Sequence, residues 1–418
     1  MNVHYSDHRK IAPGALRPDN TPDDDDRVEI GPTPLAYAEF AAAGLECPDL
    51  QALRRFRLDR LVAHLHARDY GAILLMDPLN IRYASDTTNM QLWNAHNPFR
   101  ACFVAADGHM VIWDFKRIGD LLTSFNPLVK ETRKGGASFF YFSNGDGTRD
   151  NALGFAAQIE DLMRTHCPGN RRLAVDKIMV HGLRALEARG IEVMEGEEVT
   201  EKARVVKGPD EIKAMRCAVV ACDHAMDEMR KVAVPGAAED EIWAELHRGN
   251  IKRGGEWIET RLMASGPRPK PWFQDCAPRL DKEGELLGFD TDLVGVYGMC
   301  VDISRTWFVG DGAPTQAQKD LHRVALEHIR ENTAMLGPGI PFKDLTFGGH
   351  QLPEKYVEQR YGAKMHGVGL CDEWPLITYP EDWREGLFDY VTEPGMVLCV
   401  EVYLGEVGGR EGVKLEDQ

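Results

Sequence analysis

The 418-residue sequence has no uninterrupted apolar run of the roughly 20 residues that a membrane-spanning helix requires. Residues 1–10 also lack the apolar segment of a signal peptide. Cysteine is scarce, since only nine are present and no two of them form a C-x-x-C pair. These absences argue against a membrane-spanning protein, a disulfide framework and a zinc ribbon. We therefore expect a cytoplasmic protein whose thiols are reduced and mostly buried.

The sequence also has fewer positively charged residues than negatively charged ones. Lysine and arginine total 49, whereas aspartate and glutamate total 66, so the formal net charge is −17. A chain with this charge repels the phosphate backbone of nucleic acids and anionic lipid surfaces alike. We expect neither nucleic acid nor a membrane as a partner. Apolar residues make up 43% of the chain, which is enough to build the two ordinary cores that its length suggests.

The beginning of the chain differs in composition from the rest. Residues 1–45 contain five prolines and the acidic run 23–26, a composition that buries little surface by itself. We expect an extended N-terminal arm there. Residues 46–205 then combine a helical pattern near 50–66, a buried strand at 72–76 and a hairpin turn at Asp107-Gly108. This succession predicts an α/β domain.

A second domain is expected to begin close to residue 206. Gly208 and Pro209 are followed by Asp210 and Glu211. A proline at the first helical position, with carboxylates in the first turn, is typical of a helix start. Helix-like and strand-like segments follow towards residue 418. We therefore predict an α/β (α+β) chain that consists of an arm at 1–45 and domains at 46–205 and 206–418.

Three aspartates gather in the middle of the second domain. Asp290 and Asp292 stand two residues apart in a strand-like run, and residues two apart lie on the same face of a strand. A turn at 295–298 would return the chain and bring Asp302 close to both. Three buried carboxylates repel one another unless a cation or shared protons intervene. A metal site is one interpretation of this pattern, and aspartates exposed at a strand end are the other.

Further candidate ligands follow in the C-terminal part of the chain. They are His366, Glu401 and Glu416. A charged residue amid apolar β-formers is costly unless it is paired, although a histidine beside glycines is often structural. Oxygen donors with a single imidazole suit manganese, iron or zinc in a paired site better than a structural zinc, which favours sulfur.

The order and surroundings of these residues resemble a known superfamily. The run from Lys207 to the end of the chain is similar to the catalytic domain of the creatinase, aminopeptidase P, prolidase and methionine aminopeptidase superfamily. The segment 80–83 and its surroundings resemble the creatinase-type N-terminal domain. The resemblance implies a creatinase-type N-terminal α/β domain and a C-terminal pita-bread catalytic domain. The metal positions of the superfamily match an aspartate of the cluster, Asp302, His366, Glu401 and Glu416, in that order.

Three departures from the peptidases of this superfamily are informative. Those peptidases place their first aspartate ligand where this chain has Thr291, between Asp290 and Asp292, which implies a sixth ligand. They carry a histidine after a Ser-Gly motif, and none follows Ser265-Gly266. Asp372 stands where their second histidine opens a His-Glu-x-Pro motif. The two missing histidines argue against peptide hydrolysis, and the retained ligands argue against creatinase chemistry.

The whole chain therefore resembles the dimethylsulfoniopropionate (DMSP) lyase branch of the superfamily. The resemblance implies that DMSP, a small zwitterionic sulfonium compound, is cleaved to dimethyl sulfide and acrylate by β-elimination. It also implies a divalent metal cofactor, with two ions and iron as the first candidate before manganese or zinc, and a homodimer. A Xaa-Pro-type metallopeptidase and a non-enzymatic binding module are the competing interpretations.

The elimination needs a base and a surface for the sulfonium. We expect Asp372 to be the general base, and Tyr361 to donate its phenol to the substrate or support proton transfer. Aromatic faces attract a sulfonium through cation–π interaction, so Trp272 and Trp374 are candidate contacts, and Trp93 of one subunit would close the cleft of the other. The alternatives are a carboxylate that caps a turn and tryptophans packed for their area alone.

Overall fold

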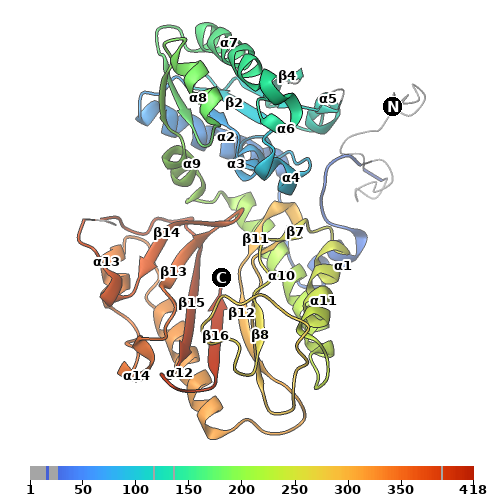
Figure 1. Ribbon diagram of the computed structural model, residues 1–418, viewed down its shortest axis with the longest axis vertical. Helices are drawn as coiled ribbons and strands as arrows, with labels where there is room; N and C mark the ends of the chain where they lie inside the picture. Colours follow the sequence, from blue (N-terminus) through green and yellow to red (C-terminus); the bar gives the residue numbers. More distant parts are fainter. Residues whose placement is uncertain (1–15, 18–26, 116–117, 135–136, 387–388) are drawn as a thin grey trace. The chain divides into compact units, whose positions relative to one another are not determined.

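The chain folds into two compact units (Figure 1). The computed structural model describes residues 16–17, 27–115, 118–134, 137–386 and 389–418. The first unit contains the described residues up to 30 together with residues 49–204. The second unit contains residues 31–48 and 205–418.

The segment before residue 45 is helical in part, where the sequence predicted an extended arm. α1 spans Pro34–Ala42 and belongs to the second unit. Proline is tolerated at the first helical position, and Ala36 and Phe40 are buried on a helix that packs against α10 (Pro209–Val232). The prediction of extended chain is therefore wrong for this stretch, because apolar burial outweighs the proline-rich composition. Residues 1–15 and 18–26, with the acidic run, lie outside the described residues.

The first unit is built on a six-stranded sheet with the order β4-β3-β2-β1-β5-β6. Its strands are β1 (Ala72–Leu75), β2 (Ala101–Ala105), β3 (Met110–Asp114), β4 (Val129–Lys134), β5 (Arg172–Val175) and β6 (Glu192–Glu195). β1 is parallel to β5 and antiparallel to β2. The predicted hairpin at Asp107-Gly108 is confirmed, because β2 and β3 pair antiparallel around it. Gly108 has a φ of 84°, which glycine adopts without steric cost.

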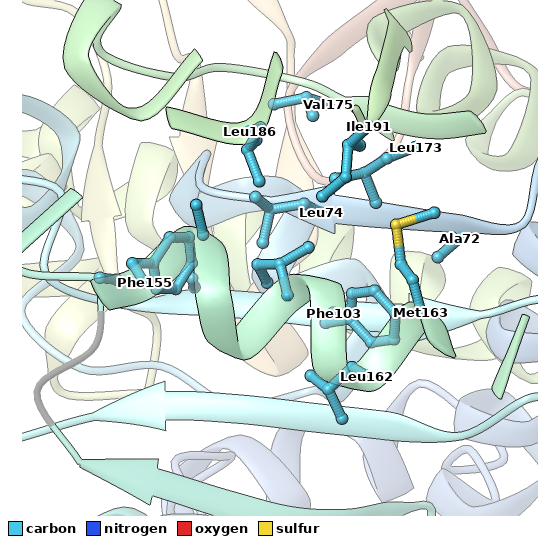
Figure 2. Close-up of a cluster of buried hydrophobic side chains, with 14 of the residues drawn as sticks. Ala72, Leu74, Phe103, Phe155, Leu162, Met163, Leu173, Val175, Leu186 and Ile191 are labelled. Atoms are coloured by element: carbon cyan, nitrogen blue, oxygen red, sulfur yellow. The ribbon is translucent and has the colours of Figure 1, made fainter. Parts of the chain in front are cut away.

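Helices cover the sheet of the first unit. They are α2 (Leu50–Ala67), α3 (Pro78–Ser85), α4 (Gln91–His96), α5 (Gly119–Thr123), α6 (Tyr141–Asn144), α7 (Thr148–His166), α8 (Val180–Glu187) and α9 (Glu197–Arg204). α7 lies across one face, where Phe155 and Leu162 share a buried cluster with Leu74 and Phe103 (Figure 2). Every residue of β1, β2 and β3 is buried. Both faces are therefore covered, as expected of an α/β layer.

The described residues of the second unit form sheets of three and four strands. The three-stranded sheets have the orders β11-β10-β7 and β12-β9-β8, and the four-stranded sheet has the order β14-β13-β15-β16. The strands are β7 (Trp257–Ile258), β8 (Met263–Ser265), β9 (Leu286–Asp290), β10 (Leu293–Val294), β11 (Cys300–Val301), β12 (Ser304–Phe308), β13 (Ala363–Val368), β14 (Asp372–Thr378), β15 (Leu398–Gly405) and β16 (Gly412–Asp417).

Helices accompany these sheets. Besides α1 and α10 they are α11 (Glu239–Ile251), α12 (Gln316–Thr333), α13 (Phe342–Phe347) and α14 (Glu354–Val357). The predicted helix start is confirmed: α10 begins at Pro209, and the backbone N–H of Gly208 donates to Glu211 Oε2 at 3.0 Å. None of the described helices has both the length and the apolar character needed to cross a membrane.

An apolar core fixes the strands that carry the C-terminal candidate ligands. α12 packs against β15 and β16, and its residues Leu321 and Ile329 share a buried cluster with Val402 and Leu404. Burying a side chain of this size contributes about 1.5–3 kcal/mol. Glu401 alternates with this cluster along β15, so its side chain lies on the opposite face of the sheet.

Candidate metal centre

The strands that frame the three aspartates form an antiparallel hairpin. β9 pairs with β12, with Asp290 opposite Ser304, and β10 pairs with β11 beyond them. Thr291 fastens the hairpin, because its hydroxyl donates to Val301 O at 2.8 Å and accepts the Ile303 N–H at 2.9 Å. The hairpin predicted from the sequence is confirmed. Thr291, which stands at the usual ligand position, has a structural role instead.

Asp290, Asp292 and Asp302 lie together in this hairpin. One carboxylate oxygen from each lies within 4.8 Å of the others, and all three residues are buried. Asp290 and Asp292 do not share a continuous strand as the pattern suggested, because β9 ends at Asp290 and Asp292 has a φ of 36°. The left-handed turn at Asp292 brings its side chain to the cluster, where the Thr260 hydroxyl donates to Oδ2 at 2.6 Å.

A second group of possible ligands overlaps the first through Asp302. It consists of Asp302, His366, Cys399 and Glu416, with one ligand atom of each within 4.8 Å of the others. In the paired strands, His366 lies opposite Cys399 and Glu401 lies opposite Glu416. The two groups contain five of the six predicted metal ligands and add Cys399, which was not predicted. The sixth, Glu401, lies beside them, with its Oε1 3.5 Å from His366 Nε2. Burial raises the pKa of this thiol well above its usual value.

The imidazole of His366 is oriented for ligation. Its Nδ1 lies 3.0 Å from Gly367 O and can donate a proton there, so Nε2 is the nitrogen that would ligate a metal after losing its own proton. Nε2 lies 3.2 Å from Glu416 Oε1, 3.4 Å from Asp302 Oδ2 and 3.5 Å from Glu401 Oε1. Backbone carbonyls commonly fix the tautomer of a metal-binding histidine in this way.

The pKa values of the buried carboxyl groups show that the cluster lacks enough positive charge to keep them all ionised. Burial, followed by repulsion from neighbouring carboxylates, raises the pKa of Asp302 well above its usual value and that of Asp292 to about 8. Burial also raises the pKa of Glu401 to about 8, although the Lys414 ammonium opposes this shift. Carboxyl groups in this state give up their protons when a divalent cation binds.

Two buried carboxylate oxygens of the cluster have no hydrogen-bond donor among the described residues. They are Asp302 Oδ1 and Glu401 Oε1. Buried polar atoms without a partner are rare and costly, so these oxygens are suited to a cation. Five buried carboxylates with one imidazole match the ligand preferences of manganese, iron and zinc. The residues present therefore fit a divalent metal.

A buried lysine, Lys414, lies inside the cluster and was not predicted. Its Nζ donates to Asp290 Oδ2 at 2.8 Å and to Glu401 Oε2 and Glu416 Oε2 at 2.9 Å. Burial alone would lower the pKa of Lys414, but these three carboxylates raise it well above its usual value. The ammonium is thus a fixed positive charge. The sequence could have indicated this position, because Lys414 and Glu416 stand two residues apart in a strand and therefore share a face.

Three predicted catalytic or substrate-binding residues border the metal centre. Asp372 Oδ1 lies 3.8 Å from His366 Nδ1, and the Asp372 side chain is 56% exposed. This carboxylate therefore lies between the cluster and solvent. Tyr361 and Trp272 lie over Lys414, with ring centroids 5.2 and 5.8 Å from its Nζ. A carboxylate and two aromatic rings thus lie beside the candidate metal ligands.

Trp374 lies elsewhere in the second unit, and the role of Trp93 in the cleft of another subunit stays a prediction. Trp374 packs against Phe342 and Tyr390, with ring centroids 5.4 and 4.9 Å apart, and it borders the α12 core. The structure does not bring Trp374 to the aromatic residues beside Lys414. Trp93 belongs to the first unit, where its ring lies 6.0 Å from that of Phe140.

Comparisons with known proteins show which families and folds the chain resembles. The pattern of metallopeptidase family M24 matches residues 213–418. The dimethylsulfoniopropionate lyase DddP of Roseovarius nubinhibens is 58% identical over 100% of this chain and 95% of its own length, and that of Roseobacter denitrificans is 55% identical over the same shares. The solved structure of a Xaa-Pro dipeptidase from Bacillus anthracis superposes with a TM-score of 0.67 at 20% identity, over 87% of this chain and 94% of its own.

These similarities establish the fold and the family. The structural likeness to the dipeptidase confirms the mixed α/β class and the pita-bread fold expected from the sequence. The sequence likeness extends over both units. The chain therefore belongs to the family of the dimethylsulfoniopropionate lyases DddP.

Proposed function

We propose that this protein is a metal-dependent DMSP lyase that forms dimethyl sulfide and acrylate. The observation that carries the proposal is the position of Asp372, a partly exposed carboxylate 3.8 Å from His366 at the edge of the six candidate ligands. A peptidase of this fold would use a histidine there. The full-length similarity to the lyases DddP supports the same reaction.

The substrate carries a carboxylate at one end and a sulfonium at the other. A divalent ion held by the six ligands would act as a Lewis acid and stabilise the negative charge that develops on the substrate carboxylate. We propose two ions, with iron as the metal and manganese or zinc as alternatives. With all five carboxylates of the cluster ionised on metal binding, two divalent ions and the Lys414 ammonium would balance their five negative charges.

Asp372 is the proposed general base. It removes the proton from the carbon next to the substrate carboxylate while the carbon–sulfur bond breaks. The electrons of that bond leave with sulfur, so neutral dimethyl sulfide departs and the new double bond completes acrylate. Partial desolvation beside the cluster raises the pKa of Asp372, with the charge of Glu416 adding to the shift and His366 opposing it, which makes Asp372 a stronger base. Its exposed position lets the accepted proton pass to solvent.

Aromatic residues are proposed to hold the sulfonium, which has no hydrogen-bond donor. Trp272 and Tyr361 border the metal centre, and Tyr403 stacks on Trp272 with ring centroids 5.6 Å apart. Burial raises the pKa of Tyr361, so its phenol stays protonated and can donate to the substrate. Trp272 Nε1 is buried without an acceptor among the described residues, and it is a second donor for a bound carboxylate. Trp374 contributes to packing instead.

Parallel incubation with DMSP and with a Gly-Pro dipeptide separates the lyase from a peptidase. We expect metal-loaded protein to release dimethyl sulfide into the headspace and to leave Gly-Pro intact, because the chain lacks the two peptidase histidines. Protein treated with a chelator is the control and should release neither product. Free amine without dimethyl sulfide would establish the peptidase, and turnover of neither compound would favour a binding module.

We also propose a homodimer in the cytoplasm. The first unit exposes apolar side chains next to Trp93, and Leu92, Tyr141 and Phe142 are 64%, 70% and 78% exposed. An apolar patch of this kind often marks an interaction surface. All nine cysteines are free thiols, which suits a reducing compartment. Light scattering at micromolar concentration should give twice the monomer mass of 46.8 kDa, and the monomer mass would refute the dimer.

A further inference from the structure

A buried ion pair lies behind Asp372, and the reaction does not use it directly. Lys207 Nζ donates to Glu373 Oε2 at 2.8 Å, and the two side chains are only 3% and 1% exposed. A buried ion pair adds little net stability, because the cost of desolvating both charges offsets their attraction. The pair can instead fix the positions of the two segments that carry Lys207 and Glu373.

Glu373 directly follows Asp372 at the start of β14. Successive side chains of a strand point to opposite faces, and here Asp372 faces His366 whereas Glu373 is buried. Glu373 Oε1 also accepts the Leu370 N–H at 3.0 Å. A Cβ at Gly369 would lie 2.5 Å from both Glu373 oxygens, so the chain passes close beside this carboxylate. Glu373 thus anchors the turn that leads into Asp372.

Lys207 is itself held by the main chain. Its backbone N–H donates to Gly395 O at 2.8 Å. The next residue, Gly208, is the N-cap of the 24-residue helix α10. The lysine therefore connects the turn before Asp372 to the start of a long, well-packed helix.

We propose that Lys207 is a positioning residue for the lyase reaction, because its ion pair with Glu373 holds Asp372 at the edge of the metal centre. The proposal rests on the proposed function of Asp372 as the base. A misplacement of about 1 Å costs on the order of 10²-fold in rate. The ion pair would therefore affect turnover, although neither Lys207 nor Glu373 is proposed to touch the substrate or the metal.

The test compares Lys207→Met with the double variant Lys207→Met/Glu373→Gln. The single variant removes the ammonium from beside the buried Glu373 carboxylate, so it should lower the melting temperature. The double variant has no unpaired charge and should recover most of that loss. We expect kcat to stay about 10- to 100-fold lower in both variants, with KM and metal content unchanged. A double variant that recovers kcat together with stability, or that loses metal, would overturn the proposal.

A matched control and a structural measurement complete the test. Arg253 forms a comparable pair with Glu39 at 2.7 Å, with the arginine side chain 3% exposed, so Arg253→Met should lower stability but not kcat. A crystal structure of the double variant should show Asp372 displaced from His366, and an unmoved Asp372 would overturn the proposal. This measurement does not depend on lyase activity. Failure of the wild-type protein to release dimethyl sulfide would instead overturn the proposed function.

Discussion

Alanine in place of Asp302 or His366 should remove both the bound metal and all detectable lyase activity. Asp302 belongs to both groups of candidate ligands, so its loss affects every ion that the centre holds. His366 supplies the only predicted nitrogen ligand, and its Nε2 faces three carboxylates. Elemental analysis of the purified variants, together with headspace measurement of dimethyl sulfide, gives both readouts.

Loss of folding must be distinguished from loss of metal in these variants. Asp281 is a matched control, because it is a buried aspartate of the second unit, 2% exposed, that lies outside both groups of candidate ligands. Asp281→Asn should keep its metal and its activity. Circular dichroism should give folded spectra for all variants. Unchanged metal content in both Asp302→Ala and His366→Ala would refute the assignment of the centre.

Asparagine in place of Asp372 should lower turnover by about 10²- to 10⁴-fold, the usual effect of losing a general base. Asparagine keeps the shape of the side chain but cannot accept a proton. Asp372 is not among the six candidate ligands, so metal content and substrate affinity should stay at the wild-type level. Turnover, KM and elemental analysis measured on the same preparation test all three expectations.

Histidine at the same position gives a further contrast. Asp372→His creates the sequence His-Glu-x-Pro of the peptidases, but the histidine after Ser265-Gly266 is still missing. We expect this variant to lose lyase activity without gaining peptidase activity. If Asp372→Asn keeps most of its dimethyl sulfide production, the base lies elsewhere, and Tyr361 becomes the next residue to test.

Part of the metal centre could be predicted because Asp290, His366, Glu401 and Glu416 lie on strands, and Asp292 and Asp302 lie in the hairpin that β9 and β12 form. The hairpin from β9 to β12 follows from alternation and a turn, and it brings Asp302 to Asp290. The contributions of His366, Glu401 and Glu416 depend on contacts between distant segments, since His366 meets Glu416 across 50 residues and Glu416 meets Ser304 across 112. No local pattern determines such pairings, so these ligands came from the family resemblance.

Other features depend on the tertiary structure and could not be read from local patterns. A register shift between His366 and Gly367 changes the alternation of β13 against β14, so the face of Trp374 could not be inferred from its spacing. The burial of Lys414 depends on the pairing of β16 with β15, which brings its ammonium to Glu401. The helix at Pro34–Ala42 depends on burial against α10, which the proline-rich composition does not disclose.

Product analysis with DMSP that carries two deuterium atoms on the carbon next to the carboxylate distinguishes β-elimination from displacement by water. β-Elimination removes one of these atoms to the base, so we expect dimethyl sulfide together with acrylate that retains a single deuterium. The labelled substrate should also react more slowly than unlabelled DMSP, because the broken bond is the labelled one. Dimethyl sulfide accompanied by 3-hydroxypropionate that retains both deuterium atoms would refute β-elimination. In that case water would have displaced the sulfonium without any proton removal by Asp372.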